Sequence, residues 1–381
     1  MIKYLDELET KDLKGKRVLL RLDLNVAVDH GKVFDDFDIQ KIIPTVDFFR
    51  GMEAQTIILA HIEDAEGNPT SLLPVFDYLH GYFPVEFCPT YFTPEAVDKL
   101  LNLKDKGVLL FENIRYNTGE KENDKDFAKQ LSAMADIYVN DAFGVSHRKH
   151  ASIVGVPEFL PHYAGFLMRQ EIEHLSKVFK PELPFVFILG GAKFDTKLPL
   201  ISKYLDTADV VFVGGALAND IFKAKGFEVG KSLISLSDSG IKDILNNPKL
   251  RTFDDVTVTT PLGQVAFKAP TEVSSDESIV DAGPKTIEQM KEILTNAKTI
   301  VWNGPIGLYE KGFKDKTENL AEIIAEATAR GAQTIIGGGD TVAAIKNLGL
   351  DHKFSFVSTG GGAMLDYLVF ETLPGIEALE K

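Results

Sequence analysis

Short apolar runs alternate with amphipathic segments along the whole chain. The runs are rich in Val, Ile, Leu and Phe and end at Gly, Asp, Asn or His, a pattern typical of strands buried on both faces of a parallel sheet. The first half has such runs at residues 17–22, 55–60, 108–111 and 137–140. The second half repeats the pattern at residues 185–189, 210–213, 299–302, 334–336 and 354–357. Helical patterns such as 125–135 and 318–330 lie between the runs and predict crossover helices.

The alternation of strands and helices predicts an α/β protein with two Rossmann-like domains, each built on a doubly wound parallel sheet. A chain of 381 residues is also long for one ordinary core. An amphipathic segment at 168–180 ends before Pro181 and Pro184, which predicts a hinge helix. We therefore expect an N-terminal domain at 1–167, a hinge helix at 168–180, a second domain at 181–362 and a tail at 363–381.

Charge and composition narrow the function classes. The formal net charge of -15 disfavours nucleic acid as a partner, because a phosphate backbone needs a basic surface. The single cysteine, Cys88, rules out an intramolecular disulfide and a cysteine metal cluster. No apolar stretch reaches membrane-spanning length. We expect a monomeric cytoplasmic protein that acts on small molecules and binds neither nucleic acid nor membranes.

Glycines follow three strands of the second half, and each time a helical pattern comes next. The turns are Asn303-Gly304-Pro305, Gly337-Gly338-Gly339-Asp340-Thr341 and Gly360-Gly361-Gly362-Ala363. Such turns present backbone N–H groups at the positive end of a helix dipole, where an anion is stabilised without a side chain. Asp340 is placed to bind Mg²⁺. The three turns together predict a site for a nucleotide polyphosphate.

Two lysines follow another glycine turn, Gly190-Gly191-Ala192. Lys193 and Lys197 are four residues apart, so on a helix they share a face and can both reach a phosphate chain. A lysine pair at this spacing is usually a solvated surface, but the glycines at a strand end favour phosphate binding. The segment 226–232 ends in Gly-Lys-Ser, but its glycines are too close together for a phosphate-binding P-loop and it follows a helical pattern.

Polar residues also follow the strands of the first half. Asp23 and Asn25 come after the first strand, His61 after the second, Arg115 after the third and His147-Arg148-Lys149-His150 after the fourth. Carboxyl ends of parallel strands meet at one edge of a sheet, so these side chains should gather there. The set suits a small anion that carries hydroxyl groups. A metal site at the two histidines of 147–150 is a less favoured alternative.

The order of these motifs resembles the phosphoglycerate kinase family over essentially the whole chain. The motifs are Arg21-Leu22-Asp23-Leu24-Asn25-Val26, Glu112-Asn113-Ile114-Arg115, His147-Arg148-Lys149-His150-Ala151-Ser152, Gly190-Gly191-Ala192-Lys193, Trp302-Asn303-Gly304-Pro305, Gly338-Gly339-Asp340-Thr341 and Gly360-Gly361-Gly362-Ala363. The resemblance implies a first domain that binds 3-phosphoglycerate or 1,3-bisphosphoglycerate. It also implies a second domain that binds MgADP or MgATP, a tail that returns to the first domain, and closure about the hinge.

The resemblance assigns roles to individual residues. It implies glycerate binding by Asp23, Asn25, His61, Arg115 and Arg148, and catalysis by Lys193, Arg148 and Gly361. It implies nucleotide binding by Lys197, Gly214, Asn303, Pro305, Glu310, Gly338, Gly339, Asp340 and Thr341, with Glu310 at the ribose and Asp340 at Mg²⁺.

Two arginines of the family pattern are replaced by aspartates. An Asp-Asp-x-Arg-Ile segment reads Asp35-Asp36-Phe37-Asp38-Ile39 here, and a His-Leu-Gly-Arg-Pro segment reads His61-Ile62-Glu63-Asp64-Ala65. If the binding geometry is unchanged, such charge reversals beside an anionic substrate weaken binding or slow turnover by several orders of magnitude. The sequence thus predicts an impaired glycerate site beside an intact nucleotide site.

Three functions remain compatible with the sequence. The first is an active phosphoglycerate kinase in which another cation, such as Lys41 or Lys149, compensates for the lost arginines. The second is a kinase of the same fold with a less anionic acceptor, and the third is a non-catalytic ATP-binding regulatory protein. The first is favoured, because most of the expected glycerate-binding residues and both catalytic lysines are present.

Overall fold

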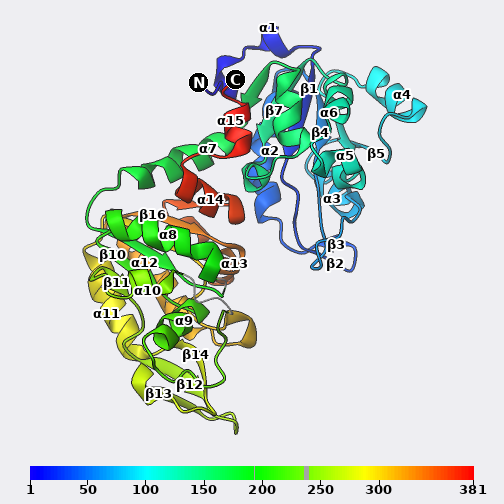
Figure 1. Cartoon of the computed structure of the whole chain (residues 1–381). Coiled ribbons are helices and arrows are strands. Elements are labelled where there is room, and N and C mark those ends of the chain that lie inside the picture. Colours follow the sequence, from blue (N-terminus) through cyan, green and yellow to red (C-terminus); the bar gives the residue numbers. More distant parts are fainter. Residues whose placement is uncertain (193, 236–239) are drawn as a thin grey trace. The chain divides into compact units, whose positions relative to one another are not determined.

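The computed structural model describes residues 1–192, 194–235 and 240–381 and divides the chain into two compact units (Figure 1). The first unit contains Met1–Glu173 and Thr372–Lys381, and the second contains His174–Glu371. Helix α7, Phe166–Leu175, includes the last residues of the first unit and the first residues of the second, and a 3₁₀ turn at Ser176–Phe179 follows it. The hinge role expected for 168–180 stays a prediction.

The first unit, all of whose residues are described, is built on a six-stranded parallel sheet. Its strands lie in the order β5 (Glu86–Cys88), β6 (Val108–Phe111), β4 (Gln55–Leu59), β1 (Arg17–Leu22), β7 (Ile137–Asp141) and β8 (His162–Ala164). The four predicted strands are therefore confirmed and form the middle of the sheet. The edge strands β5 and β8 have three residues each, which is too short to give a clear apolar run in the sequence.

Helices lie on both faces of this sheet (Figure 1) and bury the apolar side chains of its strands. They are α1 (Thr10–Leu13), α2 (Phe37–Gly51), α3 (Leu73–Leu79), α4 (Pro94–Asn102), α5 (Thr118–Lys121), α6 (Lys125–Ser132) and α15 (Pro374–Ala378). Side-chain hydrogen bonds to the backbone set where some of these helices begin. For example, the Asp124 carboxylate accepts the Phe127 N–H at 2.7 Å and caps α6.

The second unit repeats the architecture. Within its described residues a parallel sheet has the order β11 (Leu250–Arg251), β10 (Val210–Val213), β9 (Phe185–Leu189), β15 (Thr299–Asn303), β16 (Gln333–Gly337) and β17 (Phe356–Val357). Its helices are α8 (Phe194–Thr207), α9 (Ala216–Ala224), α10 (Ile241–Ile244), α11 (Pro284–Thr295), α12 (Asp315–Ala329), α13 (Gly339–Asn347) and α14 (Gly362–Phe370). The predicted fold class, two Rossmann-like doubly wound sheets, is confirmed.

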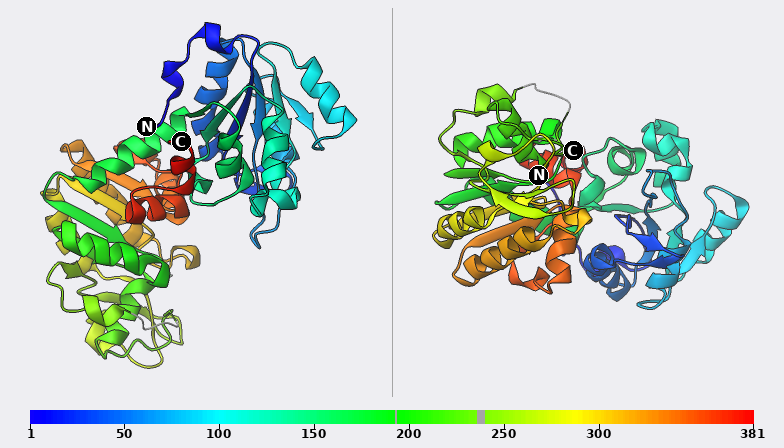
Figure 2. Two further views of the ribbon diagram at one scale, coloured as in Figure 1. Left: turned by 45° about the horizontal axis from the view of Figure 1, so that its top comes forward. Right: turned by 90° about the horizontal axis from the view of Figure 1, so that it is seen from below.

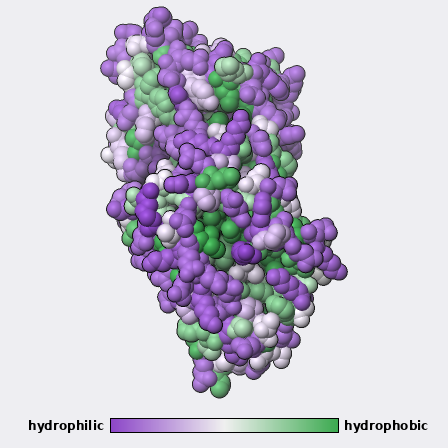
Figure 3. Space-filling view, turned by 90° about the vertical axis from the view of Figure 1, so that its left-hand side faces the viewer, coloured by the Kyte–Doolittle hydropathy of each residue, from purple (hydrophilic) through white to green (hydrophobic). Residues whose placement is uncertain are grey.

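Two antiparallel elements were not expected from the sequence. The strands β13 (Val265–Lys268), β12 (Val256–Thr259) and β14 (Ser278–Ala282) form a small sheet in the second unit, and β2 (Val28–Asp29) pairs with β3 (Lys32–Val33) in the first. The face seen in Figure 3 is mainly hydrophilic, with smaller apolar patches. No helix of the described residues is long and apolar enough to cross a membrane.

Both chain termini belong to the first unit and lie close together (Figure 2). The Gly375 N–H donates to the Ser146 carbonyl at 2.8 Å, which ties α15 to the loop after β7. Helix α14 instead packs in the second unit, where the Tyr204 hydroxyl donates to the Leu368 carbonyl at 3.2 Å. Thus 363–371 stays with the second unit, and Thr372–Lys381 returns to the first.

Candidate active site

In the second unit, the glycine turns line one cavity of about 470 Å³ at the carboxyl ends of the strands. Many of the expected nucleotide residues are among its lining: Lys197, Asn303, Pro305, Glu310, Gly338, Gly339 and Asp340. Gly361, expected to be catalytic, lines it as well. Helices α13 and α14 begin at this cavity, each after a glycine with positive φ. Their free N–H groups and positive dipole ends make the cavity suited to an anion.

Close backbone approach explains the glycines at the ends of β9 and β15. A Cβ on Gly190 would lie 2.1 Å from the Pro305 carbonyl oxygen, so only glycine fits. The Gly191 N–H donates to the same carbonyl at 2.9 Å. The two turns therefore pack directly against each other where they line the cavity.

Two of the expected nucleotide residues do not line this cavity. Thr341 is buried, and its hydroxyl accepts the Gly304 N–H at 2.8 Å, so it joins two glycine turns. Gly214 is fully covered, and a Cβ there would lie 2.8 Å from Ile306. Both residues therefore lie behind the residues that line the cavity and support its shape. Lys193, expected to be catalytic, lies outside the described residues.

Lys197 is the cation of this cavity among the described residues that line it. Its ammonium group donates to the Gly190 carbonyl oxygen. Burial lowers the pKa of Lys197 to about 8, although the nearby Asp340 carboxylate acts in the opposite direction. A partly buried ammonium with few protein partners gains from a bound anion, so Lys197 is suited to a phosphate group.

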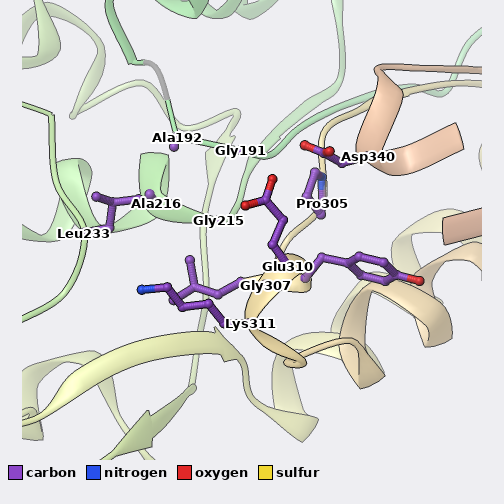
Figure 4. Close-up of a pocket in the computed structure, with 12 residues that line it drawn as sticks. Gly191, Ala192, Gly215, Ala216, Leu233, Pro305, Gly307, Glu310, Lys311 and Asp340 are labelled. Atoms are coloured by element: carbon purple, nitrogen blue, oxygen red, sulfur yellow. The ribbon is translucent and has the colours of Figure 1, made fainter. Parts of the chain in front are cut away.

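A second cavity of about 180 Å³ adjoins the first, because both include Gly191, Pro305, Glu310 and Asp340 in their lining. Figure 4 shows Leu233 and Ala216 on one side of it and Glu310 and Asp340 on the other. Its wall is mostly apolar, and the exposed Glu310 carboxylate can accept hydrogen bonds from hydroxyl groups. The arrangement fits a nucleoside whose phosphates extend into the larger cavity.

In the first unit, the structure gathers charged residues at the carboxyl ends of β1, β4, β6 and β7. The His61 ring nitrogen lies 3.8 Å from the Asp23 carboxylate and 3.4 Å from the Arg21 guanidinium. Burial and then Arg21 lower the pKa of His61 well below its usual range, so the ring is neutral at pH 7. Burial raises the pKa of Asp23 despite Arg21.

Arg115 reaches the same cluster from the turn after β6. Arg115 and Arg148 are both among the positive charges that lower the pKa of His61. The Arg115 side chain is 1% exposed, and its guanidinium contacts the Glu63 carboxylate. Arg148 is exposed on the turn after β7. Asn25 belongs to the group as well, because its side-chain oxygen accepts the Glu63 N–H at 2.8 Å.

The two replaced arginine positions have local structural roles here. The Asp64 carboxylate accepts the Asn68 N–H at 2.8 Å and the Glu66 N–H at 3.1 Å, which closes a turn and lowers its pKa. Asp38 lies in the first turn of α2, where a negative charge interacts favourably with the positive end of the helix dipole. Weakened glycerate binding from these two aspartates stays a prediction.

The sequence assigned no role to three buried residues, two of which belong to the family motifs, and did not reveal one charged contact. Arg21 donates to the Ser152 hydroxyl at 2.9 Å, and the Glu120 carboxylate accepts the same hydroxyl at 2.6 Å. Arg21 lies inside a strand rather than after it, so the rule of polar residues at strand ends does not find it. Glu63 was noted as part of a changed motif, but its contact with Arg115 could not be seen without the fold.

Comparison with known proteins agrees with this geometry. The family model for phosphoglycerate kinase matches residues 8–370. The phosphoglycerate kinase of Dictyoglomus turgidum is 40% identical over 98% of this chain and 98% of its own. That of Thermosipho africanus is 40% identical over 97% of this chain and 96% of its own.

Solved structures give the same result. The phosphoglycerate kinase of Coxiella burnetii has a TM-score of 0.83 at 35% identity, covering 100% of this chain and 98% of the other. The enzyme from Pyrococcus horikoshii has a TM-score of 0.88 at 31% identity with the same coverage. The chain therefore belongs to the phosphoglycerate kinase family and is a phosphotransferase.

Proposed function

We propose that the chain catalyses reversible phosphoryl transfer between 1,3-bisphosphoglycerate and MgADP, giving 3-phosphoglycerate and MgATP, as a glycolytic enzyme. The cavity of the second unit carries this proposal, because a partly buried lysine, bare glycine turns and an exposed carboxylate line one space. Phosphoryl transfer needs positioning and positive charge and little covalent chemistry from the protein. N–H groups at helix starts and the Lys197 ammonium supply that charge for the nucleotide phosphates.

The nucleoside would bind in the smaller cavity, with Glu310 accepting from the ribose. Asp340 would hold Mg²⁺, which neutralises phosphate charge when bound. No group of three or more His, Cys, Asp or Glu side chains in the described residues could hold a metal by itself. One exposed carboxylate ligand such as Asp340 is enough for Mg²⁺, because this ion keeps waters and takes phosphate oxygens as ligands.

The acceptor would bind in the first unit. Its carboxylate, hydroxyl and phosphate groups match the set Asp23, Asn25, His61, Arg115 and Arg148. Lys193, Arg148 and Gly361 would stabilise the phosphoryl group during transfer. We propose that the enzyme works as a cytoplasmic monomer.

A coupled assay tests the function. ATP formation from 1,3-bisphosphoglycerate and MgADP is the expected result for the full-length chain. MgADP binding without turnover of the glycerate, but with ATP consumption on another acceptor, would instead favour a kinase of different specificity. MgADP binding with no turnover on any acceptor would favour a regulatory protein, and no nucleotide binding would contradict the whole proposal.

Replacing Asp340 by Ala is expected to weaken MgADP binding about tenfold and to leave binding of Mg²⁺-free ADP nearly unchanged, because the carboxylate acts through the metal. Calorimetric titration with and without Mg²⁺ measures both affinities. Asp315→Ala is the matched control, since Asp315 is an exposed acid in the first turn of α12. Equal losses for the two forms of the nucleotide in Asp340→Ala would exclude the metal role.

The affinity for MgADP is expected to fall as the pH rises through about 8. Burial lowers the pKa of Lys197 to about 8, so the ammonium is fully charged below that pH and is lost above it. Bound phosphates favour the charged form, so binding near pH 8 takes up protons. Titration in two buffers with different ionisation enthalpies measures this uptake. The same uptake in a Lys197→Met variant would assign it to another group.

A further inference from the structure

A carboxylate of the chain contacts the buried arginine of the acceptor site. The Glu63 carboxylate lies against the Arg115 guanidinium, and the Lys121 ammonium lies 3.4 Å from the same carboxylate oxygen. Burial opposes ionisation of Glu63, but Arg115 and Lys121 together hold its pKa below the ordinary value. Glu63 is therefore negatively charged, and its carboxylate lies where Arg115 would otherwise bind an anion.

Arg115 has donor capacity that the protein does not use. All three guanidinium nitrogens are buried, and within the described residues Glu63 is the acid that contacts one of them, while the others have no hydrogen-bond partner. The Glu63 carboxylate therefore uses only part of the donor capacity of Arg115. A guanidinium has five N–H donors, and leaving them unpaired in a buried site is unfavourable. A ligand anion that forms bidentate hydrogen bonds would satisfy them better than Glu63 does.

The backbone fixes where the Glu63 side chain begins. Its N–H donates to the Asn25 side-chain oxygen at 2.8 Å, and Glu63 also forms a bridge with Pro69. Both Asn25 and Glu63 line a cavity of about 560 Å³ in the first unit, whose lining contains no lysine or arginine. The side chain can therefore leave Arg115 for this cavity while the backbone stays in place.

We propose that Glu63 determines acceptor selectivity by occupying the anion position on Arg115, so that an anionic group of the acceptor binds there only by displacing the Glu63 carboxylate. The inference rests on the proposed function, in which Arg115 binds the acceptor. Displacement weakens the binding of every anionic acceptor. It also disfavours small inorganic anions, which bring too few other contacts to compete.

The test compares full-length wild type with Glu63→Gln. The variant keeps the size of the side chain and removes its charge. We expect 3-phosphoglycerate to bind about tenfold more tightly, with a matching fall in its KM, because a charged competitor for the guanidinium is gone. The KM for MgATP should not change. Glu66→Gln is the control, because Glu66 is an exposed acid of the same loop whose N–H donates to Asp64.

A second comparison separates direct competition from a general charge effect. In an Arg115→Met background, Glu63→Gln should give no gain in affinity, because the arginine through which it acts is absent. Equal or weaker 3-phosphoglycerate binding in Glu63→Gln, or an equal gain in Glu66→Gln, would overturn the inference while wild-type turnover upheld the proposed function. If neither wild type nor Glu63→Gln bound or turned over glycerate substrates, the proposed function itself would fail.

Discussion

Replacing Lys197 by Met is expected to weaken MgADP binding about a hundredfold while the unliganded protein stays at least as stable as wild type. The affinity falls because a charge-assisted contact to phosphate in a partly dry cavity is lost. The free energy of unfolding does not fall, since burial of the charged ammonium group in the folded protein is unfavourable. Its pKa of about 8 lies below the ordinary value of 10.5.

The sign of that cost follows from proton linkage. Between about pH 8 and 10.5 the folded protein binds fewer protons at Lys197 than the unfolded chain does, so the destabilisation is complete below about pH 8. The cost disappears as the pH rises toward 10.5, and Lys197→Met removes it at all pH values. Calorimetric titration and thermal unfolding measure the two effects. The control is Lys291→Met, which removes an exposed lysine of α11.

Two results would contradict this account of Lys197. Unchanged MgADP affinity would show that the glycine turns bind the phosphates alone. A large loss of stability would show that the hydrogen bond from Lys197 to the Gly190 carbonyl outweighs the cost of burying the charge. The first result would exclude Lys197 from phosphate binding, and the second would show that Lys197 stabilises the fold.

The sequence predicted those parts of the structure that depend on local patterns. Buried runs such as Arg17–Leu22 have no polar alternation, so they identify central strands of a parallel sheet. Glycine turns at strand ends predict phosphate sites because they need only backbone groups, and Gly338, Gly339 and Gly361 do line one cavity. The antiparallel sheet around Val256–Thr259 was missed, since nothing in its short strands separates them from the surrounding α/β units.

The sequence did not predict which side chains meet. Thr341 follows the right motif, but its hydroxyl accepts the Gly304 N–H instead of facing the cavity. Asp64 replaces a family arginine, yet its carboxylate closes a turn with Asn68. Its neighbour Glu63 is the residue that contacts Arg115. Adjacent residues in an irregular loop can point in unrelated directions, so the effect of a charge change there depends on the fold.

Replacing Arg115 by Met is expected to reduce 3-phosphoglycerate affinity about a hundredfold or more, because truncating a buried charged partner of an anion is among the largest single losses in binding. MgADP affinity should stay the same, since the cavity that fits the nucleotide belongs to the second unit. Titration of each ligand separately measures both values. Arg330→Met, which removes an arginine of a surface pair with Glu326, is the control.

The stability of the double variant Glu63→Gln with Arg115→Met shows whether the ion pair serves the fold or the acceptor site. Breaking one partner of a buried ion pair is destabilising, but replacing both by neutral side chains is often neutral or stabilising. The guanidinium nitrogens of Arg115 that lack a hydrogen-bond partner make a gain more favourable here. We expect thermal unfolding of the double variant at or above the wild-type temperature, together with lost acceptor binding. A strongly destabilised double variant would mean that the pair is kept for the fold, and wild-type acceptor affinity in Arg115→Met would exclude Arg115 from the acceptor site.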